Sequence, residues 1–389
     1  MEQTFLTDIE IKKVRHLENI SIPLDKNKRK HLILTGKNGS GKTSVLEAVV
    51  KYIQSFFGEQ GTPLDHVKMM YERCLNELNQ CNLLEDSGVT LNTTSNAMLK
   101  EKYQNGNFIF AYYKAEREFQ VEEYKNIEKI EFQDKYSITE NPGIKFTKYL
   151  VDLKATQAFT KDKEKSEKIN KWFHAFEDIL KKVFEDKNLQ LHFNDETFQF
   201  SIYATDREPF DFNTMSSGYA AIFEIINDLI IRMEAKSGLR AEFDMEGVVL
   251  VDEIETHLHL ELQKKILPIL TTLFPNIQFI ITTHSPFILS SLDNTVIYDL
   301  QSRTLVENGL ENLPYEGIVE GYFKADTLSA ELRGKFERYK DLVAKEKLSD
   351  EEYEEIDKLE FYLDEIPDYL AKELTSEYSR LKLEFSNRG

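Results

Sequence analysis

The glycine-rich segment at residues 36–43, Gly-Lys-Asn-Gly-Ser-Gly-Lys-Thr, constrains the fold more than any other part of this chain. It follows a short apolar run, His31–Thr35, and precedes apolar residues at helical spacing that end before Gly58. The order is therefore strand, loop, helix. Glycines let the backbone N–H groups of such a loop curl around phosphate oxygens at a helix N-terminus. The pattern predicts a phosphate-binding loop, with Lys42 on the β- and γ-phosphates and Thr43 on Mg²⁺.

A pair of carboxylates follows a second apolar run, Val248–Val251. Four apolar residues predict a buried strand, which would place Asp252 and Glu253 at its carboxyl end, where ligands of α/β sheets bind. We predict that Asp252 holds Mg²⁺ through water and that Glu253 polarises the attacking water. A third strand, predicted over residues 277–283, delivers His284 to its own end. A histidine at a strand end is more often structural than catalytic when nothing else accompanies it.

These three elements, in this order, resemble the ABC ATPase head of RecF, OLD-type and SMC proteins. The resemblance covers about residues 1–57 and 205–300. It implies that His284 senses the γ-phosphate and acts with Glu253 in catalysis, with ATP as the substrate and Mg²⁺ as the cofactor. The expected nucleotide-binding residues are Gly36, Lys37, Asn38, Gly39, Ser40, Gly41, Lys42, Thr43 and Ser44.

The segment Met215-Ser-Ser-Gly resembles the signature motif of the same class. The resemblance implies that Ser216, Ser217 and Gly218 contact the γ-phosphate bound to the opposite copy, in a head-to-tail dimer with two shared sites. The match departs from the class after the glycine, where Tyr219 stands in place of the usual Glu or Gln.

Two further motifs lie near these elements. Residues 255–259, Glu-Thr-His-Leu-His, resemble the E-x-H-L-H-P segment of OLD and related defence ATPases, with Leu260 in place of the proline. A metal-binding His-x-His pair is the alternative interpretation of His257 and His259. The loop that links nucleotide to the lid in this class has no clear match, and its candidates are Glu116, Arg117 and Gln120.

The predicted fold is an α/β ABC ATPase head, a P-loop sheet flanked by helices, with an inserted lid and a helical C-terminal tail. The ATPase core takes residues 1–57 and 205–315, the mixed lid takes residues 58–204, and a charged helical region takes residues 316–389. Within these regions we expect helices at 63–84, 169–184, 219–234 and 258–274, the last kinked or interrupted by Pro268, a polar loop at 85–107, a strand at 108–113 and a last strand at 294–300. Because the insertion has no sustained heptad pattern, we expect no long coiled-coil arm.

The C-terminal region holds 20 acidic and 12 basic side chains over residues 316–389. A solvated helical face explains this composition, and a partner-docking stripe formed by Tyr353, Ile356, Leu359, Tyr362 and Leu363 is the alternative. Residues 318–326 share a superficial likeness with the first carboxylate motif of a TOPRIM nuclease. The later paired aspartates on a strand are missing, so we expect no nuclease within the chain.

Composition excludes several classes of protein. The formal net charge of −19 repels phosphate backbones, so any nucleic-acid contact needs a local basic patch or a partner. The apolar runs are far shorter than the roughly 20 residues of a membrane span. An acidic N-terminus without a signal-peptide pattern predicts a cytoplasmic protein. Cys74 and Cys81, seven residues apart, suit one helix face better than a metal site or a disulfide.

A compact head without arms or nuclease most resembles the ATPases of Septu anti-phage defence systems, which implies a separate effector nuclease, of the HNH type, as partner. Three alternatives stay open. A RecF-like clamp would close on DNA during repair. A membrane importer would use the chain as its nucleotide-binding subunit. A scaffold would hold ATP without turnover.

Overall fold

The computed structural model describes residues 3–57, 87–117, 128–237, 239, 243–311, 318, 330–345, 347–364 and 372–386. The chain forms two compact units, residues 1–312 and residues 313–389. Several expectations fall outside the described residues, namely the helix at 63–84, both cysteines, Gln120 and the carboxylate pattern at 320–326. Within the described residues, no helix combines the length and apolar content that crossing a bilayer requires.

The first unit alternates strands and helices along the chain. Its elements are β1 (Leu6–Val14), β2 (Leu17–Pro23), β3 (His31–Thr35), α1 (Lys42–Phe57), β4 (Val89–Thr93), α3 (Asn96–Gln104), β5 (Ile109–Tyr113), η1 (Pro142–Lys145), α4 (Phe146–Phe159), α5 (Lys163–Phe184), β6 (Gln190–Asn194), β7 (Gln199–Tyr203), α6 (Ser217–Ser237), β8 (Gly247–Val251), α7 (Leu260–Leu273), β9 (Ile277–Thr282), α8 (Pro286–Leu289), β10 (Thr295–Asp299) and β11 (Thr304–Val306).

A six-stranded sheet in the order β11-β10-β3-β9-β8-β5 forms the centre of this unit. All neighbours from β10 to β5 are parallel, and only β11 runs antiparallel. Every residue of β3, β8, β9 and β10 is buried, as expected for a parallel sheet covered on both faces. The predicted strands at 31–35, 248–251 and 277–283 are confirmed within a residue. The expectation that the strand at 294–300 is the last was wrong, because the short β11 pairs with β10.

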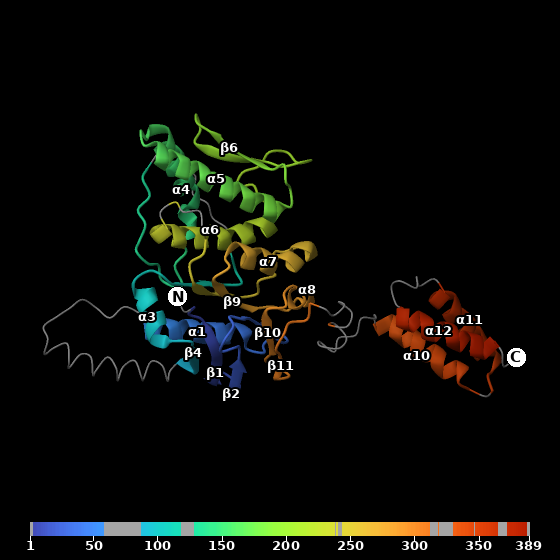
Figure 1. The fold of residues 1–389 in the computed structure, drawn as a ribbon. Helices are drawn as coiled ribbons and strands as arrows, with labels where there is room; N and C mark the ends of the chain where they lie inside the picture. Colours follow the sequence, from blue (N-terminus) through green and yellow to red (C-terminus); the bar gives the residue numbers. More distant parts are fainter. Residues whose placement is uncertain are drawn as a thin grey trace. The chain divides into compact units, whose positions relative to one another are not determined.

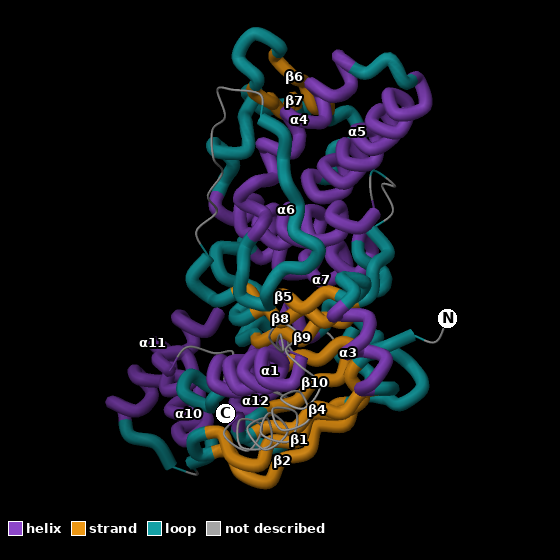
Figure 2. The backbone as a smooth tube through the Cα atoms, turned by 90° about the vertical axis from the view of Figure 1, so that its left-hand side faces the viewer, coloured by secondary structure: helices purple, strands orange, loops and turns teal. Residues whose placement is uncertain are grey.

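A second, antiparallel sheet in the order β2-β1-β4 shares its core with α1. Ile9 pairs with Ile22 and Ile11 with Ile20, so apolar side chains gather on one face of β1 and β2. Figures 1 and 2 show α1 between these strands and the six-stranded sheet. Gln278 of β9 joins the two sheets, because its amide accepts from Leu6 N (2.8 Å) and donates to Leu6 O (3.0 Å). The glycine loop that follows β3 therefore starts from a sheet that is hydrogen-bonded to a second sheet.

The polar loop expected at residues 85–107 was wrong over most of its length. Residues 89–93 form β4, which pairs with β1, and residues 96–104 form α3. The Ser95 hydroxyl caps α3 by accepting from Met98 N at 3.3 Å, and Leu99 is fully buried. Pairing with β1 and burial of one face outweigh the polar composition. The adjacent β5 pairs with β8, so the six-stranded sheet takes one strand from the range assigned to the lid.

Helices α6 and α7 cover the face of the six-stranded sheet opposite α1, and α4, α5 and the β6–β7 hairpin lie beyond them (Figure 1). The predicted amphipathic helix at 169–184 is confirmed within α5, whose stripe from Ile169 to Phe184 is buried. Its Trp172 is fully buried, stacks on Phe176 and donates from Nε1 to Glu234 Oε1 of α6 at 2.7 Å. Pro268 lies inside α7 and does not interrupt it.

The second unit contains three helices among its described residues, α10 (Ala330–Val343), α11 (Asp350–Asp364) and α12 (Lys372–Ser386). Tyr339, Ile356 and Leu363 are almost fully buried in their shared core. Two members of the candidate docking stripe therefore hold this unit together instead of facing a partner. Tyr353 (51% exposed) and Tyr362 (37% exposed) remain on the surface.

Candidate functional site

The glycine loop predicted to bind phosphate leaves the carboxyl end of β3 and enters α1. Gly36, Gly39 and Gly41 all have positive φ, at 136°, 81° and 99°. A Cβ on Gly36 would lie 2.8 Å from Ser40 Oγ, and one on Gly41 would lie 2.9 Å from Leu17 Cδ1. The positive φ favours glycine at both positions, and a Cβ there would also make the Ser40 or Leu17 side chain shift.

Lys42 starts α1 and turns its side chain into the loop. The residue is only 5% exposed, and Nζ donates to Gly36 O (3.0 Å) and to Lys37 O (3.4 Å). Burial lowers the pKa of Lys42, and the negative charges of Glu253, Glu255 and Asp252 oppose that shift. The loop thus encloses an ammonium group that faces carboxylates from the neighbouring strands.

The other loop residues divide into buried and exposed members. Ser44 is buried, and Ser40 is buried with no hydrogen-bond partner for its hydroxyl among the described residues. Lys37, Asn38, Gly39 and Thr43 are exposed. An unpartnered hydroxyl inside a glycine loop and an exposed threonine at the start of the helix both suit a ligand with many acceptor oxygens.

The carboxylate pair follows β8, next to β9 in the sheet. Asp252 is 2% exposed, and its Oδ1 accepts from the Thr282 hydroxyl of β9 at 2.5 Å. The same Thr282 Oγ1 accepts from Glu253 N at 2.7 Å. Glu253 itself has φ of 43°, a left-handed conformation that is uncommon outside glycine. One hydroxyl thus fixes both predicted site residues, and no local sequence pattern singles out Thr282 for this role.

Arg117, four residues after β5, holds the same turn from the other side. It is 7% exposed, and its guanidinium donates to the carbonyls of Asp252 (3.1 Å), Glu253 (3.1 Å) and Ile254 (3.4 Å). Glu116 is exposed. Of the two described candidates for the lid-linking loop, Arg117 contacts the carboxylate turn directly, through the turn's backbone.

His284 lies just past β9, beside the carboxylate turn. Its backbone N–H donates to Glu255 Oε1 at 2.5 Å. His284 Nε2 and Glu255 Oε2 are both buried without a hydrogen-bond partner among the described residues. Burial and the nearby Lys42 charge lower the pKa of His284, so the imidazole is neutral at pH 7. A neutral imidazole has one donor and one acceptor nitrogen to offer a ligand.

The signature-like segment lies at the start of α6. Ser216 and Ser217 are exposed and Gly218 is buried. A Cβ on Gly218 would lie 3.1 Å from His257 O, so the glycine allows α6 to pack closely on the segment after the carboxylate pair. Among the described residues, no group of three or more His, Cys, Asp or Glu side chains is arranged to hold a metal ion. His257 and His259 therefore belong to no such group.

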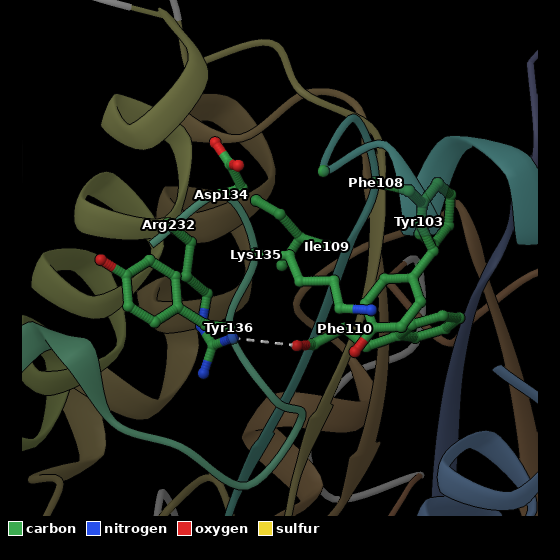
Figure 3. Close-up of a pocket in the computed structure, with 9 residues that line it drawn as sticks. Tyr103, Phe108, Ile109, Phe110, Asp134, Lys135, Tyr136 and Arg232 are labelled. Carbon is green, nitrogen blue, oxygen red and sulfur yellow. Dashed lines mark hydrogen bonds between the residues drawn. The ribbon is translucent and has the colours of Figure 1, made fainter. Parts of the chain in front are cut away.

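The three motifs therefore meet at one edge of the sheet. The glycine loop follows β3, His284 follows β9 and Asp252 follows β8, and these strands are parallel neighbours. A separate pocket lies at the amino end of β5, lined by Phe108, Lys135 and Arg232 among others (Figure 3). Because β5 runs parallel to β8, β9 and β3, its amino end lies at the opposite end of the sheet from the glycine loop.

Comparison with known proteins agrees with this arrangement. Residues 131–290 match the protein family described as "AAA domain, putative AbiEii toxin, Type IV TA system". These residues are thus similar to an AAA domain. The matched segment contains the carboxylate pair and His284, and it ends at residue 290, before β10.

The chain is also similar in sequence to individual proteins. The "Septu protein PtuA" of Bacillus mycoides (strain KBAB4) is 25% identical over 378 residues, which cover 92% of this chain and 50% of that protein. The "Retron Ec83 probable ATPase" of Escherichia coli is 32% identical over 143 residues, 36% of this chain and 26% of that protein. The chain thus spans half the length of the first relative and less of the second. A solved SMC head bound to the C-winged helix domain of ScpA has a TM-score of 0.40 at 13% identity, covering 79% of this chain and 99% of that one.

Proposed function

We propose that the chain binds Mg-ATP at the edge formed by β3, β9 and β8 and hydrolyses it. One observation carries the proposal: the glycine loop, the carboxylate pair and His284 come from distant parts of the sequence and meet at the ends of three adjacent parallel strands. The likeness to a relative named as a probable ATPase supports it. Phosphate transfer needs positioning and charge more than covalent chemistry, and this edge offers both.

Each side chain at this edge has a proposed task. Lys42 binds the β- and γ-phosphates, Glu253 orients and polarises the attacking water, and His284 donates to the γ-phosphate. Thr43 and Asp252 would hold Mg²⁺, since hydroxyl and carboxylate oxygens are the hard ligands that this ion prefers, with phosphate and water completing its shell. The ion, when bound, neutralises charge that develops on the phosphates.

We further propose that two copies associate head to tail, so that Ser216, Ser217 and Gly218 of one copy complete the site of the other. The exposure of both serines at the start of α6 supports this assignment. Mixing variants tests it. Lys42→Ala and Ser217→Arg should each abolish turnover, whereas an equal mixture should recover about a quarter of wild-type turnover, because half of the random dimers keep one intact site. No recovery in the mixture would contradict shared sites.

On the likeness to the Septu and retron ATPases, we propose that the protein acts in the cytoplasm as the regulatory ATPase of an anti-phage defence system and gates a separate effector nuclease of the HNH type. Glu253→Gln should trap the ATP-bound state, which makes it the bait for a pull-down from the native host. Recovery of a nuclease that depends on ATP supports the gating role. Recovery of DNA and repair proteins alone would contradict it and favour a RecF-like clamp.

A further inference from the structure

Arg117 and Glu224 each keep one buried polar atom without a hydrogen-bond partner among the described residues. These atoms are Arg117 Nε, a donor, and Glu224 Oε2, an acceptor. Such atoms are rare in folded proteins and call for an explanation. A carboxyl oxygen can accept the hydrogen bond that Arg117 Nε has to donate.

The other nitrogens of Arg117 are already engaged. They donate to three consecutive carbonyls of the turn at residues 252–254, which holds the left-handed Glu253 in place. Nε can therefore take a new acceptor without releasing that turn. Glu224 lies about two helical turns after Ser217, on the helix that begins with the signature-like segment. Burial lowers the pKa of Arg117 and the charge of Glu224 opposes that shift, while burial raises the pKa of Glu224 and Arg117 opposes it.

We propose that Arg117 is a positioning residue for the catalytic turn, and that Glu224 pairs with its Nε when α6 shifts on engaging the second copy. Through the Arg117 side chain, a change in the position of α6 would then change the position of Glu253. This inference rests on the proposed ATP hydrolysis and on the proposed head-to-tail dimer. It adds a contact within one chain that would link α6, which begins with the signature-like segment, to Glu253, the residue proposed to polarise the attacking water.

The test uses the full chain and compares turnover with ATP binding. Arg117→Lys keeps the charge but loses the planar fork, so kcat should fall about 10- to 100-fold through misplacement of the turn, with the Kd for ATP changed less than about 3-fold. Arg232→Lys is the matched control, since Arg232 is similarly buried and binds carbonyls of Phe110 and Ser137 away from the turn. It should lower Tm and leave kcat within about 3-fold.

A double-mutant cycle tests the pairing itself. Glu224→Ala should lower kcat, Glu224→Gln should restore part of it, and Arg117→Lys with Glu224→Ala should be no slower than Arg117→Lys alone. Independent, multiplicative effects would overturn the pair, and an unchanged kcat in Arg117→Lys would overturn the positioning role. A wild-type protein without ATPase activity would instead reject the proposed function, which separates the two failures.

Discussion

Two buried arginines, Arg117 and Arg232, differ in how fully their surroundings satisfy them. Arg232 donates to Asp228 Oδ2 at 2.7 Å and to the carbonyls of Phe110, Ser137 and Glu140. Asp228 also accepts from Tyr113 Oη at 2.5 Å. Arg117 holds the turn at residues 252–254 but leaves Nε unpaired among the residues that the structure describes. A saturated network fixes a fold, whereas unpaired groups around the proposed nucleotide site remain available for a ligand or a moving helix.

The largest expected effect comes from breaking the saturated network. Asp228→Ala removes the acceptor for Arg232 and Tyr113 and leaves a buried charge unpaired, so the free energy of unfolding should fall by about 3–5 kcal/mol. Urea unfolding checks this. A loss below about 1 kcal/mol would show that the network is not structural. The ATP affinity of the folded fraction should not change.

The second prediction concerns the nucleotide edge. Lys42→Ala removes a buried ammonium from the glycine loop, so the affinity for ATP should fall about 10- to 100-fold, as expected for charge-assisted contacts with phosphate. Isothermal titration calorimetry measures it. Unfolding should be affected little, because the variant also removes a desolvated charge. Equal ATP affinity in wild type and variant would place the nucleotide elsewhere.

The third prediction concerns the unpaired Glu224. Burial raises the pKa of Glu224 to about 7, with Arg117 opposing and Asp228 adding to the shift. The folded state therefore holds a proton that the unfolded chain releases, and this contribution to stability is lost as pH rises from about 4.5 through 7. Glu224→Gln should raise stability at pH 8 by about 1 kcal/mol and change it little at pH 5. Thermal unfolding at both pH values checks this, and equal effects at the two would contradict the shift.

The smallest effect belongs to the surface. Lys265 of α7 and Glu185 form an ion pair at 2.8 Å, with both side chains at least a third exposed. Glu185→Gln should change the free energy of unfolding by less than about 0.5 kcal/mol. A larger loss in urea unfolding would show that this contact orders the inserted lid.

The sequence predicts what depends on local periodicity. The strand, glycine loop and α1, and the strands that deliver Asp252 and His284, follow from apolar runs and helical spacing. The strand β4 and helix α3 could not be predicted, because their stability comes from pairing with β1 and from burial. The hydrogen bonds of Thr282 and Arg117 to the turn could not be predicted either. Thr282 lies 29 residues from Glu253, and Arg117 lies 135 residues from Asp252. Neither a solvated face nor a docking stripe predicts that Ile356 and Leu363 are buried in a core, because a helix pattern does not say which neighbour covers it.

The most direct test of the central claim is ATP turnover by wild type and Glu253→Gln, measured with the Kd for ATP on the same samples. We predict that wild type hydrolyses ATP and that Glu253→Gln binds it with similar affinity but turns it over about 10²- to 10⁴-fold more slowly. Equal turnover by the two proteins would show that Glu253 does not activate water and would contradict the account.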